Sequence, residues 1–404
     1  MCQYSSTDIF KPASFPEHTY VSRKSHDLPF SYEERLKIAL NTPGYLTSIV
    51  GPSKIGKTVL CEKVIGFENT KFLTGSDFSD QEDIWIPIAK KVGLSIENEH
   101  TELRQIEATD SSELSNLRSV SNRGTFLTGK DKVIEYFKEN DLVLVLDDFH
   151  YAPQSVQYKI AYQLKEAIRK DFKAIIISLP HRADDAIRKN PDLSGRLNLI
   201  NIEPWDTNEL KNIAITGFEK LHVKVSDEII SEIAQESLHS PQLMQDICLR
   251  FAYVYDLDNH KPLEMVTDQS KLKEAYLVTT VNLQYHEVVK RLEQGPPTRG
   301  QKRKTYKLEN GEKVDVYGLF FLAMALDPPK ISVALDELKE RYDLLLKNNN
   351  ASLPDRNKIR STVQHLQLII DEMSETIYQV FEWKDNKVYV LEPLFLFFLR
   401  WGKY

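Results

Sequence analysis

Four residues near the start of the chain have the types and the spacing needed to bind phosphate. Residues 51–58 read GPSKIGKT and fit the pattern G-x-x-x-x-G-K-[ST] without a mismatch. Glycine lets the backbone pass close to a phosphate, and the N–H groups at the start of a helix supply positive potential. In this pattern the lysine reaches the outer phosphates of a nucleotide and the hydroxyl coordinates Mg²⁺. We therefore predict that the whole loop binds ATP or ADP, through Gly51, Pro52, Ser53, Lys54, Ile55, Gly56, Lys57, Thr58 and Val59.

A pair of carboxylates farther along the chain would complete such a site. Residues 142–150 read LVLVLDDFH, in which five apolar residues precede Asp147 and Asp148. A continuous apolar run predicts a strand buried on both faces, as in a parallel sheet. Asp147 would then hold Mg²⁺ together with Thr58, and Asp148 would polarise the attacking water, with Lys57 as the other catalytic group. The alternative is a buried strand whose terminal acids only cap the next helix.

The elements around these residues predict an α/β fold. The stretch 45–50, YLTSIV, precedes the loop as a strand, a helix follows from Thr58, and another strand is predicted at 174–179. Further helices are predicted at 31–41, 80–94 and 130–140. Strands that alternate with helices indicate a parallel sheet covered on both faces, here the core of a P-loop NTPase. The expected buried face of the first helix consists of Leu36, Ile38, Ala39 and Leu40.

The pattern becomes helical from residue 207. Helices are predicted at 207–221, 226–237 and 240–257, with Thr207 and Ser226 as caps, which indicates a helical lid beside a nucleotide. The polar stretch 95–123 reads as an exposed insertion. The predicted domains are an extended N-terminal segment (1–30), an ATPase core (31–205), the lid (206–258), a linker with a basic loop (259–313) and a winged-helix-like domain (314–404).

The strand ending in two aspartates also carries a resemblance. LVLVLDDFH followed by IIISLPHR resembles the STAND ATPases, a signalling branch of the AAA+ class. In ATPases of this type a polar residue at the end of the strand predicted here at 174–179 senses the γ-phosphate. This implies that role for Ser178 or Arg182. The alternative for Ser178 is a small residue packed in a strand. Residues 16–23, PEHTYVSR, are similar to a segment that contacts adenine in such proteins, which implies nucleotide contacts for Tyr20, Val21 and Arg23.

Two further segments between residues 14 and 258 support the resemblance. Residues 239–243, HSPQL, resemble the G-x-P motif of the STAND lid, whose proline touches the nucleotide. That proline is Pro241 here, and His239 stands in place of the glycine. AAA+ proteins also carry an arginine that reaches the phosphate of a neighbouring subunit, and Arg196 matches its position. The alternative for Arg196 is a surface arginine that caps a strand.

The C-terminal third combines a basic loop with a winged-helix pattern. Residues 290–307 hold seven basic residues and one acid, Glu293. Such a loop could hold a nucleic-acid backbone, pair with an acidic protein, or simply be solvated. Helices predicted at 316–326, 333–346 and 355–373 precede a hairpin at 380–391 and a last helix at 391–401. This end resembles that of archaeal-type AAA+ ATPases, and the third helix of a winged helix often enters the major groove. The candidates for nucleic-acid binding are Arg299, Lys302, Arg303, Lys304, Arg356, Lys358 and Arg360.

Composition narrows the classes of function. The chain has 404 residues, a net charge of −7 and three separated cysteines. These features argue against a chain-wide nucleic-acid coat and against a zinc site. No apolar run approaches the roughly 18 residues of a membrane helix, and the N-terminus has no signal-peptide pattern. We therefore expect a cytoplasmic protein that does not contact a membrane.

The resemblance implies a Mg²⁺-dependent ATPase that acts as a STAND/AAA+ switch. It would exchange ADP for ATP and then form a homo-oligomer or act through a separate effector or sensor protein. A role in bacterial defence follows only by analogy with this class. The alternative is a DNA-acting AAA+ ATPase, a loader or transposition-type regulator, that uses the basic loop and winged helix on double-stranded DNA. A P-loop small-molecule kinase has no use for the C-terminal part, and a scaffold that never hydrolyses ATP has no use for Asp148.

Overall fold

The computed structural model describes residues 4–78, 83–95, 129–149, 152–180, 193, 195–259, 264–298, 300, 302–346, 353–373 and 379–402. The chain forms two compact units. The sheet unit comprises Arg23–Gly51 and Lys57–Ile202, and the helical unit comprises Met1–Ser22, Pro52–Gly56 and Glu203–Tyr404. Nearly all of the insertion predicted at 95–123 lies outside the described residues. In the described part of the chain, no helix has both the length and the apolar character of a membrane span.

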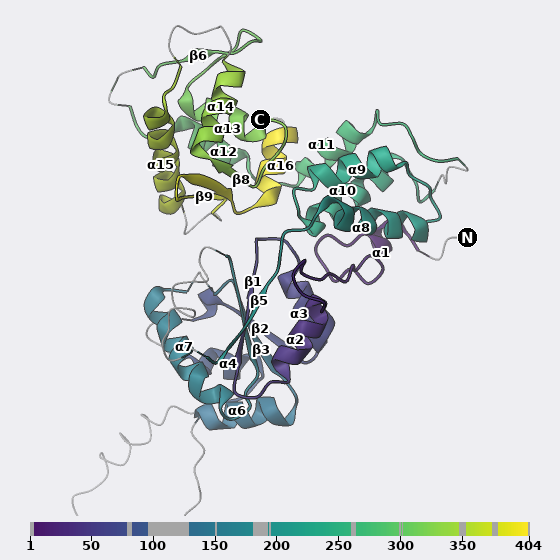
Figure 1. The fold of residues 1–404 in the computed structure, drawn as a ribbon, viewed down its shortest axis with the longest axis vertical. Coiled ribbons are helices and arrows are strands. Elements are labelled where there is room, and N and C mark those ends of the chain that lie inside the picture. The colour runs from purple at the N-terminus through teal and green to yellow at the C-terminus, as the bar shows by residue number, and fades with distance from the viewer. Residues whose placement is uncertain are drawn as a thin grey trace, which may run out of the picture. The chain divides into compact units, whose positions relative to one another are not determined.

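The sheet unit is built on five parallel strands in the order β2-β3-β4-β1-β5. The strands are β1 Leu46–Val50, β2 Thr70–Thr74, β3 Val143–Asp147, β4 Ala174–Ser178 and β5 Leu197–Asn201. The helices are α2 Tyr32–Leu40, α3 Lys57–Ile65, α4 Trp85–Lys91, α6 Gly129–Glu139 and α7 Gln154–Ile168, with a 3₁₀ turn η1 at Gly75–Asp77. In Figure 1, α2 and α3 lie on one side of the sheet and α4 and α7 on the other. The predicted α/β fold is confirmed, with the phosphate-loop pattern following β1 as in P-loop NTPases.

Burial in this unit follows from helices on both faces of the sheet. Leu144 and Val145 in β3 are consecutive, so they point to opposite faces, and both are fully buried. The prediction for α2 is wrong at one position. Leu36 and Ala39 are buried, but Ile38 is 55% exposed. Residues three apart share a helix face, and position 38 falls outside the stripe set by 36 and 39.

The helical unit begins with an N-terminal segment and includes four helices that follow the sheet unit in the sequence. These are α8 Thr207–Lys220, α9 Asp227–Glu236, α10 Pro241–Val254 and α11 Leu272–Val281. The three predicted lid helices are present, and Ser226 caps α9 as expected. The cap of α8 is Asp206 rather than Thr207, because the Asp206 carboxylate accepts from the Glu209 N–H at 2.7 Å. Helix α11 was not indicated by the sequence pattern.

The N-terminal segment, which the sequence predicts to be extended, contains a short helix, α1 Ser6–Ile9, and several turns. The Ser6 N–H and hydroxyl both donate to the Asp258 carboxylate, at 2.8 and 2.7 Å. Phe10 is 1% exposed and its ring lies 5.1 Å from that of Phe218. Gln245 donates to the Thr19 hydroxyl at 2.6 Å. The segment is therefore part of the core of the lid helices.

Beyond the lid, the helical unit continues with helices and two small antiparallel sheets. The elements are α12 His286–Gln294, β6 Tyr306–Lys307, β7 Lys313–Val314, α13 Val316–Ala325, β8 Ser332–Ala334, α14 Leu335–Leu345, α15 Arg356–Glu372, β9 Phe381–Lys384, β10 Lys387–Val390 and α16 Pro393–Trp401. Strands β8, β10 and β9 form one sheet in that order. Asp385 and Asn386 have φ values of 51° and 58°, so the predicted hairpin closes with a type I′ turn. The helices and hairpin predicted after residue 314 are present, whereas α12 and β8 were not indicated.

Candidate functional site

In the sheet unit, the predicted magnesium ligands meet although they lie far apart in the sequence. The Thr58 hydroxyl donates to Asp147 Oδ2 at 2.6 Å. Thr58 is the second residue of α3, and Asp147 is the last residue of β3. Because β1 and β3 are parallel, the loop after β1 and the acid at the end of β3 reach the same edge of the sheet. The two oxygens that the sequence assigns to Mg²⁺ are therefore adjacent.

The lysine of the loop and the end of β4 lie at the same edge. Lys57 Nζ donates to the Gly51 carbonyl at 3.0 Å. Ser178, the last residue of β4, pairs in register with Val50, and its carbonyl accepts from the Gly51 N–H at 3.3 Å. Ser178 is 6% exposed. The predicted sensor position therefore directly borders the start of the loop.

Asp148 is presented by a backbone turn at the end of β3. Its φ of 48° lies in the left-handed region, and its N–H donates to Asp147 Oδ1 at 2.9 Å. The residue is exposed, unlike the strand before it. Gly75 packs against this turn so closely that a Cβ there would meet the Ala152 nitrogen at 2.6 Å and the Asp148 carbonyl at 2.8 Å. The absence of a side chain at position 75 therefore sets where the turn that carries Asp148 can lie.

In the helical unit, residues 52–56 of the loop are held by groups at the ends of the lid helices. The Trp205 indole donates to the Ile55 carbonyl at 3.0 Å, and His239 Nδ1 donates to the Trp205 carbonyl at 2.7 Å. The Ser240 hydroxyl donates to the Lys54 carbonyl at 3.3 Å. His239 has a φ of 62°, a conformation that glycine adopts most easily. Pro241 follows as the first residue of α10.

The residues present fit a nucleotide with its magnesium. Lys54 and Gly56 have φ values of 60° and 91°, and such alternation turns successive N–H groups inward to form an anion-binding concavity. Mg²⁺ prefers oxygen ligands and takes one or two carboxylates plus phosphate oxygens and water. Thr58 and Asp147 supply that protein share. Among the described residues no group of three or more His, Cys, Asp or Glu could hold a metal ion.

One cysteine lies beneath the site without joining its chemistry. Cys61 on α3 is fully buried. Burial, together with the negative charge of Asp147, raises the pKa of the Cys61 thiol well above its ordinary value. It is therefore a neutral core side chain rather than a nucleophile.

The remaining candidates lie elsewhere in their units. The Arg196 carbonyl accepts from the Leu46 N–H at 2.9 Å, at the amino end of β1. Five strand residues separate this point from Gly51, roughly 16 Å at the rise of a strand, so Arg196 does not border the loop that follows β1. Arg23 is 8% exposed, with its guanidinium 5.6 Å from the Tyr32 ring centroid. In the helical unit Tyr20 stacks on Phe15 with centroids 6.0 Å apart, and Val21 follows it. Arg182 lies outside the described residues.

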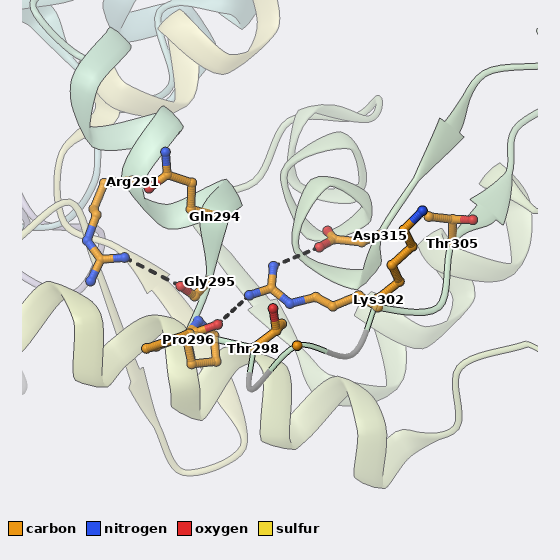
Figure 2. Close-up of a pocket in the computed structure, with 11 residues that line it drawn as sticks. Arg291, Gln294, Gly295, Pro296, Thr298, Lys302, Thr305 and Asp315 are labelled. Atoms are coloured by element: carbon orange, nitrogen blue, oxygen red, sulfur yellow. Dashed lines mark hydrogen bonds and ion pairs between the residues drawn. The ribbon is translucent and has the colours of Figure 1, made fainter.

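A second candidate site surrounds the basic loop of the helical unit. An open pocket of about 750 Å³ is lined by Arg291, Gln294, Gly295, Pro296, Pro297, Thr298, Gly300, Lys302, Arg303, Thr305 and Asp315 (Figure 2). Arg303 forms an ion pair with Asp315 at 3.0 Å, donates to the Pro296 carbonyl, and lies 4.7 Å from the Tyr317 ring centroid. Its charge is thus already engaged in holding the loop together.

The other basic candidates differ in how they are presented. Lys302, Lys304 and Lys358 are exposed, and Lys304 lies over the Tyr306 ring at 5.1 Å. Arg356 pairs with Asp336 at 2.9 Å, with both side chains about two-thirds exposed. Arg360 is partly buried, and Arg299 lies outside the described residues. Lys302, Lys304, Lys358 and Arg356 are therefore exposed, whereas Arg303 and Arg360 are partly buried.

Comparison with known proteins gives no family. No family model matches the chain, and no curated protein matches it. Cdc6p of Pyrobaculum aerophilum is a similar solved structure, with 14% identity, 96% of this chain and 94% of that chain covered, and a TM-score of 0.45. A Walker-type ATPase of Pyrococcus abyssi has 13% identity, coverage of 91% and 94%, and a TM-score of 0.49. The Holliday junction branch migration motor RuvB of Thermotoga maritima has 12% identity, coverage of 91% and 95%, and a TM-score of 0.39. Similarities at this level assign neither a family nor an activity to this chain.

Proposed function

We propose that this chain binds ATP with Mg²⁺ at residues 51–58 and hydrolyses it. The observation that carries the proposal is the 2.6 Å hydrogen bond between Thr58 and Asp147. It joins the hydroxyl of the loop to the first acid after β3, the two groups that we predict to hold the same cation. A buried strand whose acids only cap a helix gives no reason for this contact with the loop.

Each residue has a distinct task in the proposed reaction. When bound, Mg²⁺ would neutralise negative charge that develops on the phosphate oxygens. Thr58 and Asp147 hold the cation, and the Lys57 ammonium turns from the Gly51 carbonyl to the outer phosphates. Asp148, exposed next to them, orients and polarises the water. Ser178 borders the loop where the γ-phosphate would lie, and Tyr20, Val21, Arg23 and Pro241 remain the proposed contacts to the rest of the nucleotide.

Binding and turnover of the Lys57→Ala and Asp148→Ala variants test this assignment. We expect Lys57→Ala to lose ATP binding, because it removes the charge that faces the phosphates. Asp148→Ala should bind ATP normally but turn it over about 10²–10⁴-fold more slowly, the usual contribution of a positioned base. Lys63→Ala, an exposed lysine farther along the same helix, is the matched control. Equal ATP affinity in wild type and Lys57→Ala would refute the site.

We further propose that the ATPase works as a switch. Residues 52–56 of the loop belong to the same compact unit as the lid and the C-terminal helices, so a change in the loop has a physical path to them. The output would be a homo-oligomer, with Arg196 reaching the phosphate of a neighbouring copy, or a separate partner protein. Mass in solution with ATP and with ADP distinguishes the two, since only the first changes the mass of the purified chain.

A DNA-acting ATPase is the second candidate. The winged helix that we propose for this candidate would consist of α13, β8, α14, α15, β9 and β10. The exposed Lys302 and Lys304 carry positive charge in the basic loop, and the exposed Lys358 carries it at the start of α15. Binding through phosphate contacts weakens steeply with salt. This candidate would be favoured if the chain binds duplex DNA at about 50 mM salt with an affinity that falls as the salt concentration rises, and if the DNA stimulates ATP turnover. No binding at that salt would exclude it.

A further inference from the structure

One end of α16 is anchored to the lid by a buried ion pair. Arg400 donates to both oxygens of Glu236, at 3.0 and 2.7 Å, and the side chains are only 7% and 8% exposed. The Trp401 indole donates to the same carboxylate at 2.6 Å, and Arg400 also donates to the Ala325 carbonyl at 2.6 Å. A bidentate pair with further hydrogen bonds is the arrangement in which buried charges hold a specific geometry. Removing Arg400 would leave the buried Glu236 carboxylate without the cation that balances its charge.

The other end of α16 lies beside the phosphate loop. Glu392 is the N-cap of this helix, and its carboxylate is 3.9 Å from the ammonium group of Lys54. The Glu392 side chain is 15% exposed, which limits the screening of its charge by water. A negative charge next to residue 54 attracts the ammonium group of Lys54 but repels the phosphates of a nucleotide. Glu392 therefore competes with the proposed ligand.

Residues 236–240 of the lid link the anchored end of α16 to the phosphate loop. Glu236 ends α9, and His239 and Ser240 follow it within four residues. His239 holds the Trp205 carbonyl, the Trp205 indole holds the Ile55 carbonyl, and Ser240 holds the Lys54 carbonyl. Residues 236–240 thus contact α16 on one side and the loop on the other. All of these groups belong to the helical unit.

We propose that α16 is a latch whose docking opposes nucleotide binding. With α16 docked on Glu236, Glu392 is held against Lys54, and triphosphate entering the loop displaces this carboxylate. Such coupling is reciprocal, so loosening α16 strengthens nucleotide binding and nucleotide loosens α16. The inference rests on the proposed function, because it requires the loop to bind a nucleotide.

Titration with Mg²⁺–ATP tests the first half of the coupling. Glu392→Gln removes the competing charge, and Arg400→Gln removes the anchor. Both should lower the dissociation constant about five-fold or more, the lower range of measured couplings. Asp327→Asn is the matched control, because Asp327 pairs with the same arginine at 2.7 Å but is 80% exposed. It should stay within about two-fold of wild type, as expected for a surface pair.

Hydrogen exchange of the backbone amides of residues 393–401 tests whether nucleotide loosens α16. Because it can be measured on the wild-type chain, it remains informative if Glu392→Gln or Arg400→Gln folds poorly. Adding Mg²⁺–ATP to the wild-type chain should speed exchange in α16, and the same addition to Lys57→Ala should not. If Lys57→Ala loses binding but Glu392→Gln, Arg400→Gln and the exchange rates match wild type, the latch is overturned and the proposed function stands. If wild type and Lys57→Ala bind ATP equally, or wild type binds none, both inferences fail.

Discussion

Replacing Gly75 with alanine should separate nucleotide binding from turnover. The new Cβ would lie 2.6 Å from the Ala152 nitrogen, 2.8 Å from the Asp148 carbonyl and 3.0 Å from the Phe149 carbonyl. All three are backbone atoms, so no side chain can rotate away. Restoring an ordinary contact of 3.4 Å to the Ala152 nitrogen requires a shift of about 0.8 Å. The turn that carries Asp148 must therefore move.

The expected effects of Gly75→Ala follow from this shift. Overpacking of this kind costs about 1–3 kcal/mol of stability, and a displacement of about 1 Å in a catalytic group costs about 10²-fold in rate. ATP affinity should change little, since Lys57 and Thr58 lie on α3. Phosphate release under steady-state conditions gives the rate, equilibrium titration gives the affinity, and thermal melting gives the stability.

The control is a glycine with room for a side chain. A Cβ at Gly318 in α13 would meet Val314 atoms at 3.5 and 3.8 Å, which is ordinary contact. Gly318→Ala should be neutral or more stable by up to about 1 kcal/mol, because alanine is the better helix former. A Gly75→Ala chain with wild-type turnover and wild-type melting would refute the argument that position 75 sets the place of Asp148.

Two further predictions concern Thr58 and Glu232. Thr58→Val removes the hydroxyl bonded to Asp147 and should abolish the dependence of ATP affinity on Mg²⁺, whereas Thr58→Ser should keep it; equal Mg²⁺ dependence in all three chains would contradict the assignment. Burial, and then the charge of Glu236, raise the pKa of Glu232 in the folded chain. The contribution of protonated Glu232 to the free energy of unfolding is therefore fully present at pH values below the pKa that this residue has in the unfolded chain. It is lost as the pH rises through the higher pKa that the residue has in the folded chain. Glu232→Gln should thus raise the melting temperature at about pH 8 but not at about pH 4, and an equal shift at both values would argue against this linkage.

The sequence was most informative where chemistry is local. The loop 51–58, the apolar strand before Asp147 and the Asp-Asn turn each depend on neighbouring residues, and the structure has them where the patterns indicated. Long-range contacts were not predictable in the same way. Trp205 bonds to a carbonyl 150 residues away, and the only sequence signal was an isolated tryptophan just before a helix cap.

Arg303 shows why residue type alone misleads. In the sequence it belongs to a run of basic residues that suits a phosphate backbone, but its guanidinium contacts Asp315, the Pro296 carbonyl and the Tyr317 ring. None of these three partners was indicated by the sequence pattern. A count of charged residues takes no account of carbonyl groups and aromatic rings. A charge pattern therefore predicts where a cationic side chain lies in the sequence, but not whether contacts within the fold already occupy it.

The docked N-terminal segment has a consequence for the order of folding. Ser6 forms hydrogen bonds with Asp258, which lies 252 residues later in the chain, and Thr19 with Gln245, which lies 226 residues later. At about 5–20 residues per second, a ribosome needs roughly 10–50 s to make that distance. Until then Ile9 and Phe10 have no lid helices to bury them, and the whole sheet unit, which ends at Ile202, is synthesised in the meantime. This segment is made before the sheet unit and the lid helices but completes its contacts only after both, so we expect a chaperone to meet it while it is still exposed.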